Sequence, residues 1–338
     1  MTSIAGGSIQ RVLVEWSDAM RILGLVLAGV VAILAFGVSW IGNDIYGETL
    51  KVDPACHDAP LFTADSAKLT VASNPLAHQI DPTVYGRVQS VSFPSRDGKV
   101  EVAGLLSPPP AGGPLVIATH GFTGCKHHKH GLSIIGILAS AGYGVLAIDL
   151  REHGESTVLD GVAALGSDEF SDVLGARDYA IHTLGLAPSE VGFWGESMGG
   201  ATTLIANTHE DLGPLFLDAP FADIKLVMKD NSDRASVPRW TIDIISSAVS
   251  LWRNYDFTTV TPLDGLVERP EQAIFWVHGT ADETVGFHHA EMARDAVASN
   301  DRKTFFVADG IGHVATLWDR PSEYRLSLVS FFDAHLKD

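Results

Sequence analysis

The segment 195–200, which reads Gly-Glu-Ser-Met-Gly-Gly, constrains the fold more than any other part of this chain. It follows a short apolar run, 191–194, and precedes a helix-forming run, 201–207. This context predicts a strand that turns sharply into a helix. The flanking glycines permit the turn because a side chain at either position would collide with the neighbouring backbone. We expect the turn to strain the backbone at Ser197 and to push its hydroxyl out of the sheet.

Short apolar segments alternate with helix-forming segments through most of the chain. A hairpin is predicted first, with its turn at Asp97-Gly98, a dipeptide that favours tight turns. Strands separated by helices indicate a mainly parallel sheet with helices on both faces, and therefore an α/β fold. The predicted strands are 88–93, 100–106, 115–119, 145–149, 191–194, 215–219, 273–278 and 304–307.

Two loops that follow later strands carry the groups that would activate a serine. A serine hydroxyl is a weak nucleophile unless a histidine, oriented by a carboxylate, takes its proton. Asp282 follows the strand 273–278, and His313 follows the strand 304–307. Because the carboxyl ends of parallel strands share one edge of a sheet, Ser197, Asp282 and His313 are predicted to converge there. Asp218, at the end of the preceding strand, and the adjacent Glu283 are competing candidates for the acid.

The chain order of serine, acid and histidine resembles that of the α/β-hydrolase superfamily. The segments 149–156 and 278–282 also match that pattern, and the resemblance covers residues 85–338, most closely to the serine esterase and serine aminopeptidase-like branch. It implies that the backbone N–H groups of Met198 and Phe122 form the oxyanion hole. It also implies that the reaction needs no metal and no organic cofactor. His120 is expected to brace the oxyanion loop, and His153 is expected to be structural.

These residues predict a serine hydrolase that cleaves carboxylic ester or thioester bonds through an acyl-enzyme on Ser197. The expected substrate is a small-molecule or lipid-like acyl compound. A serine exopeptidase or an acyltransferase with the same triad remains an alternative, as does a non-catalytic membrane-tethered binding protein. A haloalkane or epoxide hydrolase is disfavoured because those enzymes need a carboxylate at the position of Ser197.

The N-terminal part of the chain contains 20 consecutive residues without a charge, 22–41. As a helix this run is about 30 Å long, the thickness of the hydrocarbon core of a bilayer. It predicts a single transmembrane anchor, and it is longer than the apolar region of a cleaved signal peptide, which is the alternative. Arg11 and Arg21 precede the run. They predict that residues 1–21 stay in the cytoplasm and that the catalytic domain is extracytoplasmic.

The remaining boundaries follow from composition. Residues 42–84 contain four prolines and no sustained period, so they are predicted to be a tether to a domain at 85–338. Within that domain, about 50 residues separate two strands. This connection, about 220–270, includes the apolar segment 240–252 and predicts a lid or cap. The alternative is a helix that simply packs on the sheet.

Charge and cysteine content exclude some classes of function. The net charge of −18 gives no electrostatic footprint for nucleic acid. The short basic cluster 126–130 holds three histidines, but without a frame of acidic or cysteine ligands we interpret it as a solvated loop and predict no metal site. Cys56 and Cys125 would be able to pair in an extracytoplasmic compartment. Two free or buried thiols are the alternative.

Overall fold

An eight-stranded mixed sheet forms the centre of the domain in the computed structural model, which describes residues 5–52, 62–73, 75–253, 261–297 and 301–336. The strand order is β1-β2-β4-β3-β5-β6-β7-β8, and only the β1–β2 and β2–β4 pairs are antiparallel. This confirms the predicted α/β-hydrolase architecture. The strands are β1 (Gln89–Pro94), β2 (Glu101–Ser107), β3 (Leu115–Thr119), β4 (Gly144–Ile148), β5 (Val191–Glu196), β6 (Leu215–Asp218), β7 (Ile274–Gly279) and β8 (Lys303–Ala308).

Helices cover both faces of the sheet, and each face has its own hydrophobic core. One core includes buried residues of α4 (Phe170–Asp178), α5 (Met198–His209), α8 (Pro262–Val267) and α9 (His288–Ala296). The other includes residues of α2 (Ala64–Ala72), α3 (Lys129–Ser140), α10 (Thr316–Asp319) and α11 (Pro321–Leu336). The central strands β3, β4, β5 and β6 are buried along their whole length. This explains why they read as continuous apolar runs in the sequence.

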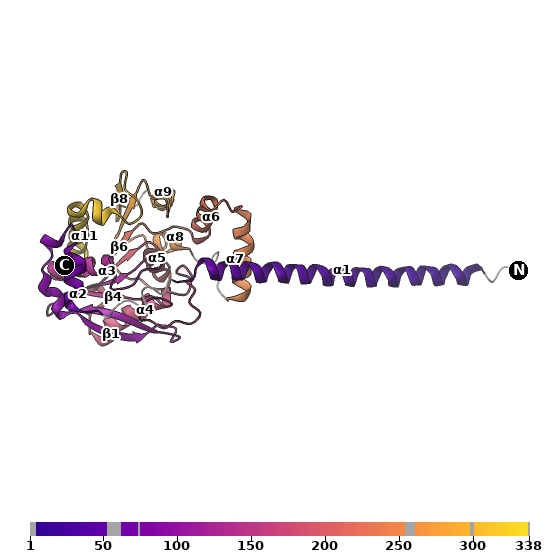
Figure 1. Cartoon of the computed structure of the whole chain (residues 1–338), viewed down its shortest axis with the longest axis horizontal. Helices are drawn as coiled ribbons and strands as arrows, with labels where there is room; N and C mark the ends of the chain where they lie inside the picture. Colours follow the sequence, from indigo (N-terminus) through magenta and orange to yellow (C-terminus); the bar gives the residue numbers. More distant parts are fainter. Residues whose placement is uncertain (1–4, 53–61, 74, 254–260, 298–300, 337–338) are drawn as a thin grey trace.

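The N-terminal helix α1 (Ala5–Thr49) leaves the domain and extends far beyond it (Figure 1). The most apolar 18-residue stretch of its segment Leu23–Thr49 has a mean hydropathy of 2.4 and is not buried, and the segment is long and apolar enough to cross a membrane. Exposed apolar side chains on this scale are unfavourable in water, which agrees with membrane anchoring of the chain.

The segment predicted to be a tether differs from that expectation in its described part. Helix α1 continues to Thr49, and Tyr46 and Leu50, one turn apart on the same face, are buried in the domain core. The Tyr46 hydroxyl donates to the carbonyl of Ala163 at 2.8 Å, and the N–H of Val52 donates to the carbonyl of Gly161 at 2.9 Å. The prolines that suggested irregular structure begin only after the helix has ended. The end of α1 is therefore docked directly on the domain.

The predicted lid segment contains two helices close to α1 (Figure 1). They are α6 (Ile224–Arg234) and α7 (Trp240–Trp252), while residues 254–260 lie outside the described part of the chain. Helix α7 packs tightly against α1 at Gly42, where an added Cβ would lie 3.1 Å from the Cβ of Ala248. The indole N–H of Trp252 donates to Ser39 Oγ at 3.0 Å. The alternative of a helix that packs only on the sheet does not hold, because α7 packs on α1 and α6.

Candidate active site

Ser197 lies at the sharp turn between β5 and α5, as its sequence context predicts. Its φ of 48° and ψ of −120° are strained for a residue with a side chain. The turn needs glycine on both sides, because a Cβ on Gly195 would lie 2.7 Å from Gly200 Cα. A Cβ on Gly199 would lie 2.4 Å from the carbonyl oxygen of His120. The N–H of Ser197 donates to the carbonyl of Asp218 at 2.8 Å, which fixes the turn on the neighbouring strand.

His313 lies between Ser197 and Asp282, although the three residues are far apart in the sequence. Its Nε2 lies 2.9 Å from Ser197 Oγ, and its Nδ1 lies 2.7 Å from Asp282 Oδ2. The carboxylate fixes the tautomer, since Nδ1–H donates to it and leaves the lone pair of Nε2 facing the serine hydroxyl. This is the hydrogen-bonded arrangement that activates a serine hydroxyl in nucleophilic catalysis.

Asp282 is buried but surrounded by donors. Its Oδ1 accepts the backbone N–H groups of Thr284 at 2.9 Å and Val285 at 2.8 Å. Burial alone would raise the pKa of this carboxyl, but the hydrogen bonds from His278 and His313, with that of Val285, outweigh it and hold the pKa well below its usual range. Asp282 therefore stays ionised and accepts a hydrogen bond from His313 Nδ1–H.

Asp218 and Glu283, the two other candidates for the acid, do not contact His313. Asp218 is buried on the other side of the turn, where burial and the nearby Glu196 raise the pKa of its carboxyl to about 6. Its hydrogen bond comes from the hydroxyl of Tyr324. Glu283 is exposed to solvent. Among the three carboxylates considered from the sequence, only Asp282 is hydrogen-bonded to the histidine.

The two N–H groups implied for the oxyanion hole border the serine. Met198 is the first residue of α5, so its N–H has no partner within the helix, and Phe122 lies in the loop after β3. The loop is close to the serine, because a Cβ on Gly121 would lie 3.3 Å from Ser197 Cβ. Among the described residues, no hydrogen bond occupies the N–H of Phe122 or of Met198. His120 braces this loop as predicted, accepting from Leu150 N–H at 3.0 Å and contacting Gly121 O at 2.8 Å.

A buried pair beside the nucleophile was missed by the sequence analysis. Glu196 Oε2 pairs with His130 Nδ1, and Glu196 Oε1 accepts the N–H of Gly121 at 3.3 Å. Burial would raise the pKa of Glu196, but His130 outweighs it and lowers the pKa. Trp318 Nε1 donates to His130 Nε2 at 2.6 Å and orients the ring. A carboxylate at the end of an apolar strand was the available signal, because a buried charge needs a partner.

The interpretation of 126–130 as a solvated loop was therefore wrong for its two ends. Lys126 is 1% exposed, and its ammonium pairs with Asp149 and Glu155 at 2.5 Å each. His130 is 8% exposed and pairs with Glu196. The acidic partners lie far away in the sequence, so the cluster by itself looks like an exposed basic run. Whether Cys56 and Cys125 pair was left open by the sequence, and residue 56 lies outside the described residues.

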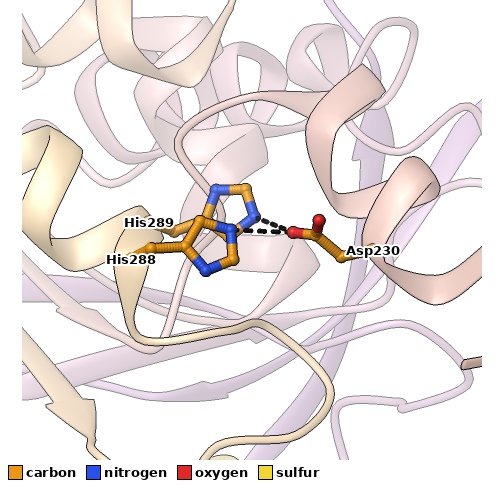
Figure 2. A group of neighbouring side chains, drawn as sticks. All are labelled: Asp230, His288 and His289. Carbon is orange, nitrogen blue, oxygen red and sulfur yellow. Dashed lines mark hydrogen bonds and ion pairs between the residues drawn. The ribbon is translucent and has the colours of Figure 1, made fainter. Parts of the chain in front are cut away.

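A second polar cluster, Asp230, His288 and His289, joins α6 to α9 (Figure 2). His288 Nε2 lies 2.8 Å and His289 Nε2 lies 3.5 Å from Asp230 Oδ2. His289 Nδ1 accepts the N–H of Ala222 at 3.2 Å, so the proton of this ring lies on Nε2. A protonated nitrogen has no lone pair for a metal ion. The cluster is therefore better suited to connect two helices than to hold a cation.

A cavity of about 440 Å³ lies in front of Ser197. Phe122, Met198 and Phe221 line it near the serine, α6 and α7 cover it, and the end of α1 forms one wall. No charged side chain is found among the described residues that line it. Its volume lies within the range typical of small-molecule sites, which are mostly apolar with a few convergent polar groups.

Comparison with known proteins places this site in a family. The profile of the prolyl oligopeptidase family matches residues 131–338. The human protein ABHD12B is 25% identical over 214 residues, which cover 56% of this chain and about half (53%) of the human protein. The Salmonella typhi protein YfhR is 25% identical over 272 residues, which cover 76% of this chain and 86% of that protein.

Solved structures share the fold at low identity. The esterase Pf2001 of Pyrococcus furiosus matches with a TM-score of 0.60 and 18% identity, covering 82% of this chain and 98% of the esterase. A puromycin-hydrolyzing peptidase of Mycobacterium tuberculosis matches with a TM-score of 0.57 and 18% identity, covering 76% of this chain and 41% of the peptidase. The fold, the serine turn and the matching profile lead to one conclusion: this chain belongs to the prolyl oligopeptidase family and has the α/β-hydrolase fold.

Proposed function

We propose that this protein is a serine hydrolase that cleaves carboxylic ester or thioester bonds. Ser197 is the nucleophile, His313 the general base and Asp282 the acid that orients it. The distances of 2.9 Å from His313 Nε2 to Ser197 Oγ and 2.7 Å from His313 Nδ1 to Asp282 Oδ2 support these roles. The family membership agrees with a hydrolase but leaves the bond that is cleaved open.

The proposed reaction has two halves. Ser197 Oγ attacks the carbonyl carbon while its proton moves to His313 Nε2, and the N–H groups of Phe122 and Met198 bind the oxyanion. Collapse of the intermediate breaks the bond to the alcohol or thiol, which leaves with the proton from His313. In the second half, His313 takes a proton from water, and the resulting hydroxide attacks the acyl-enzyme. The acid is released and Ser197 regains its proton.

The uncharged lining of the cavity favours esters over peptides. An exopeptidase needs a charged group for the free terminus of its substrate, because a buried unpaired charge is costly. The described lining of this cavity offers neither a cation nor an anion. A neutral acyl group fits such a lining without any desolvated charge. The uncharged lining of the cavity is therefore the observation that supports an ester substrate most strongly.

Hydrolysis of two matched substrate series tests it. We expect the full-length protein in detergent to hydrolyse 4-nitrophenyl esters and to leave amino-acid 4-nitroanilides almost untouched. Ser197→Ala should lower kcat on the esters by about 10⁶-fold, the usual consequence of losing a triad nucleophile. Ser133→Ala is the matched control, because Ser133 is also a buried serine but lies on α3.

Other outcomes identify the alternatives. Cleavage of the anilides in preference to the esters would contradict the proposal in favour of an exopeptidase. Transfer of the acyl group to an added alcohol as the main reaction would point to an acyltransferase. Inertness of the folded wild-type protein toward every ester would point to a membrane-tethered binding protein.

A further inference from the structure

Helix α7 has an apolar face that the domain does not cover. Trp240, Ile244 and Leu251 are spaced by four and seven residues, so they lie on one side of the helix. Trp240 is 63% exposed and Leu251 is 70% exposed. The only charged residue of α7, Asp243, pairs with Lys225 at 2.7 Å and Lys229 at 3.0 Å. An exposed apolar stripe of this kind marks a surface that contacts something other than water.

This face continues the apolar surface of α1. Ile244 and Leu251 line a groove with Val31, Leu34 and Phe36 of the membrane helix. The ring of Phe36 lies 5.3 Å from the ring of Trp252 in an edge-to-face contact. Helix α7 lies across α1 where α1 leaves the domain (Figure 1). It therefore lies at the end of the run 22–41 that is long enough to cross the bilayer.

One side of the cavity mouth lies at the same level, and Asn231 on α6 and Thr284 after β7 are also exposed at the cavity. The lining residues that remain exposed include Ile45 and Thr49 on α1 and Val237 in the connection between α6 and α7. Ile45 and Thr49 follow the last residue of the apolar run, Ile41, by one and two turns, which places them about 6 and 12 Å beyond it along the helix. The headgroup layer on each side of a bilayer is roughly 5–8 Å thick. The mouth therefore begins within the headgroup layer.

We propose that α7 is a second membrane-contacting element, and that the cavity in front of Ser197 takes its substrate from the lipid bilayer through the opening between α1 and the α6–α7 connection. This rests on the proposed function of Ser197 and names the substrate class. Interfacial helices with an apolar face bind in this way, and tryptophans are enriched at this depth.

The cavity itself sets the substrate class. Its volume of about 440 Å³ lies toward the lower end of the range for small-molecule sites, which suits one apolar chain rather than two. Its uncharged lining keeps any charged headgroup outside, at the mouth. The substrate is therefore an ester with a single long acyl chain that resides in the membrane.

The first test compares two exposed leucines. The full-length protein is reconstituted in phosphatidylcholine vesicles, with 4-methylumbelliferyl oleate as the membrane-resident ester and 4-nitrophenyl acetate as the soluble one. We expect Leu251→Glu to lower hydrolysis of the oleate about tenfold or more, since withdrawing one leucine from an apolar medium costs that much. Acetate hydrolysis should stay within a factor of two.

Leu326→Glu is the matched control, because Leu326 is 66% exposed on α11, at the far end of the domain from α1 (Figure 1). It should change neither rate. Equal oleate rates for wild type and Leu251→Glu would overturn the proposal. Absence of acetate hydrolysis in the wild type would instead contradict the proposed function, so the two failures are distinguishable.

A second test does not depend on activity. The fluorescence difference between wild type and Trp240→Phe reports on Trp240 alone. In vesicles of phosphatidylcholine brominated near the headgroup end of its acyl chain, we expect this difference to be strongly quenched relative to unbrominated vesicles. The difference between wild type and Trp318→Phe, whose indole lies in the domain, should not be quenched. An unquenched Trp240 would overturn the proposal for α7.

Discussion

Asp282 and Asp218 are two buried carboxylates at neighbouring strand ends, and their surroundings separate their roles. Asp282 accepts hydrogen bonds from two backbone N–H groups and from His313 Nδ1–H, so its pKa is lowered. Asp218 faces Glu196 in a dry environment, so the pKa of its carboxyl is raised to about 6. Asp282 is therefore the stable negative charge that contacts the histidine, whereas Asp218 keeps its proton up to about pH 6 and makes no contact with His313.

Substitution of each aspartate by asparagine should show which of the two orients the histidine. Asp282→Asn should lower kcat by about 10⁴-fold, because the amide holds the histidine in the wrong tautomer. Asp218→Asn should leave kcat nearly unchanged. Ester hydrolysis by the two variants measures this, and a larger loss for Asp218→Asn would contradict the assignment of the acid.

Asp218→Asn should also change the dependence of stability on pH. The folded protein keeps this proton up to about pH 6, whereas the unfolded chain loses it near the ordinary pKa of 3.8. The contribution of this group to the free energy of unfolding is therefore present at low pH and is lost as the pH rises through 6. The total loss is about 3 kcal/mol. The melting temperature of the variant minus that of wild type should therefore be more positive at pH 8 than at pH 5.

The sequence was sufficient to predict that Ser197, Asp282 and His313 come together, but not which residues support them. Ser197, Asp282 and His313 follow three different strands, so a parallel sheet alone brings them to one edge. The pair of Glu196 with His130 depends on how α3 packs beside the serine turn, and spacing along the chain carries no information on that. A short basic run has the same composition whether it is solvated or paired with distant carboxylates.

At the scale of elements, α1 is both a helix long and apolar enough to cross a membrane and part of the domain. The apolar run was predicted from its length and composition, but the helical structure and burial of the last two turns of α1 were not. Residues 42–49 are too short a segment to show a period, and their burial depends on contacts with α7 and the 161–163 loop. Tertiary contacts of this kind override local composition, which is why a tether was expected there.

The orientation of α1 is a prediction that stands apart from the chemistry. Because Arg11 and Arg21 precede the run and no basic residue follows it until Lys51, the N-terminus should remain in the cytoplasm. In spheroplasts of a bacterial host, added trypsin should digest the domain and leave an N-terminal tag protected. Protection of the domain, with digestion only after the membrane is opened, would contradict this orientation.

The whole molecule combines a predictable fold with an arrangement that the sequence did not reveal. Alternating strands and helices predicted a mainly parallel α/β sheet, since the periodicity of each element is local, and the resemblance in the order of serine, acid and histidine implied the α/β-hydrolase architecture. The position of the cavity between α1 and the α6–α7 segment is not local, because residues about 200 apart in the chain meet there. Their meeting places the proposed catalytic serine and the end of α1 on the same cavity.

The central claim is that Ser197 is an activated nucleophile, and covalent labelling tests it most directly. The full-length protein is treated with a fluorophosphonate probe and mapped by peptide mass spectrometry. Because His313 Nε2 is hydrogen-bonded to Ser197 Oγ, we predict a single modification on the peptide that contains Ser197, and none in Ser197→Ala. A folded wild-type protein that takes no label, or label that persists elsewhere in Ser197→Ala, would contradict this account.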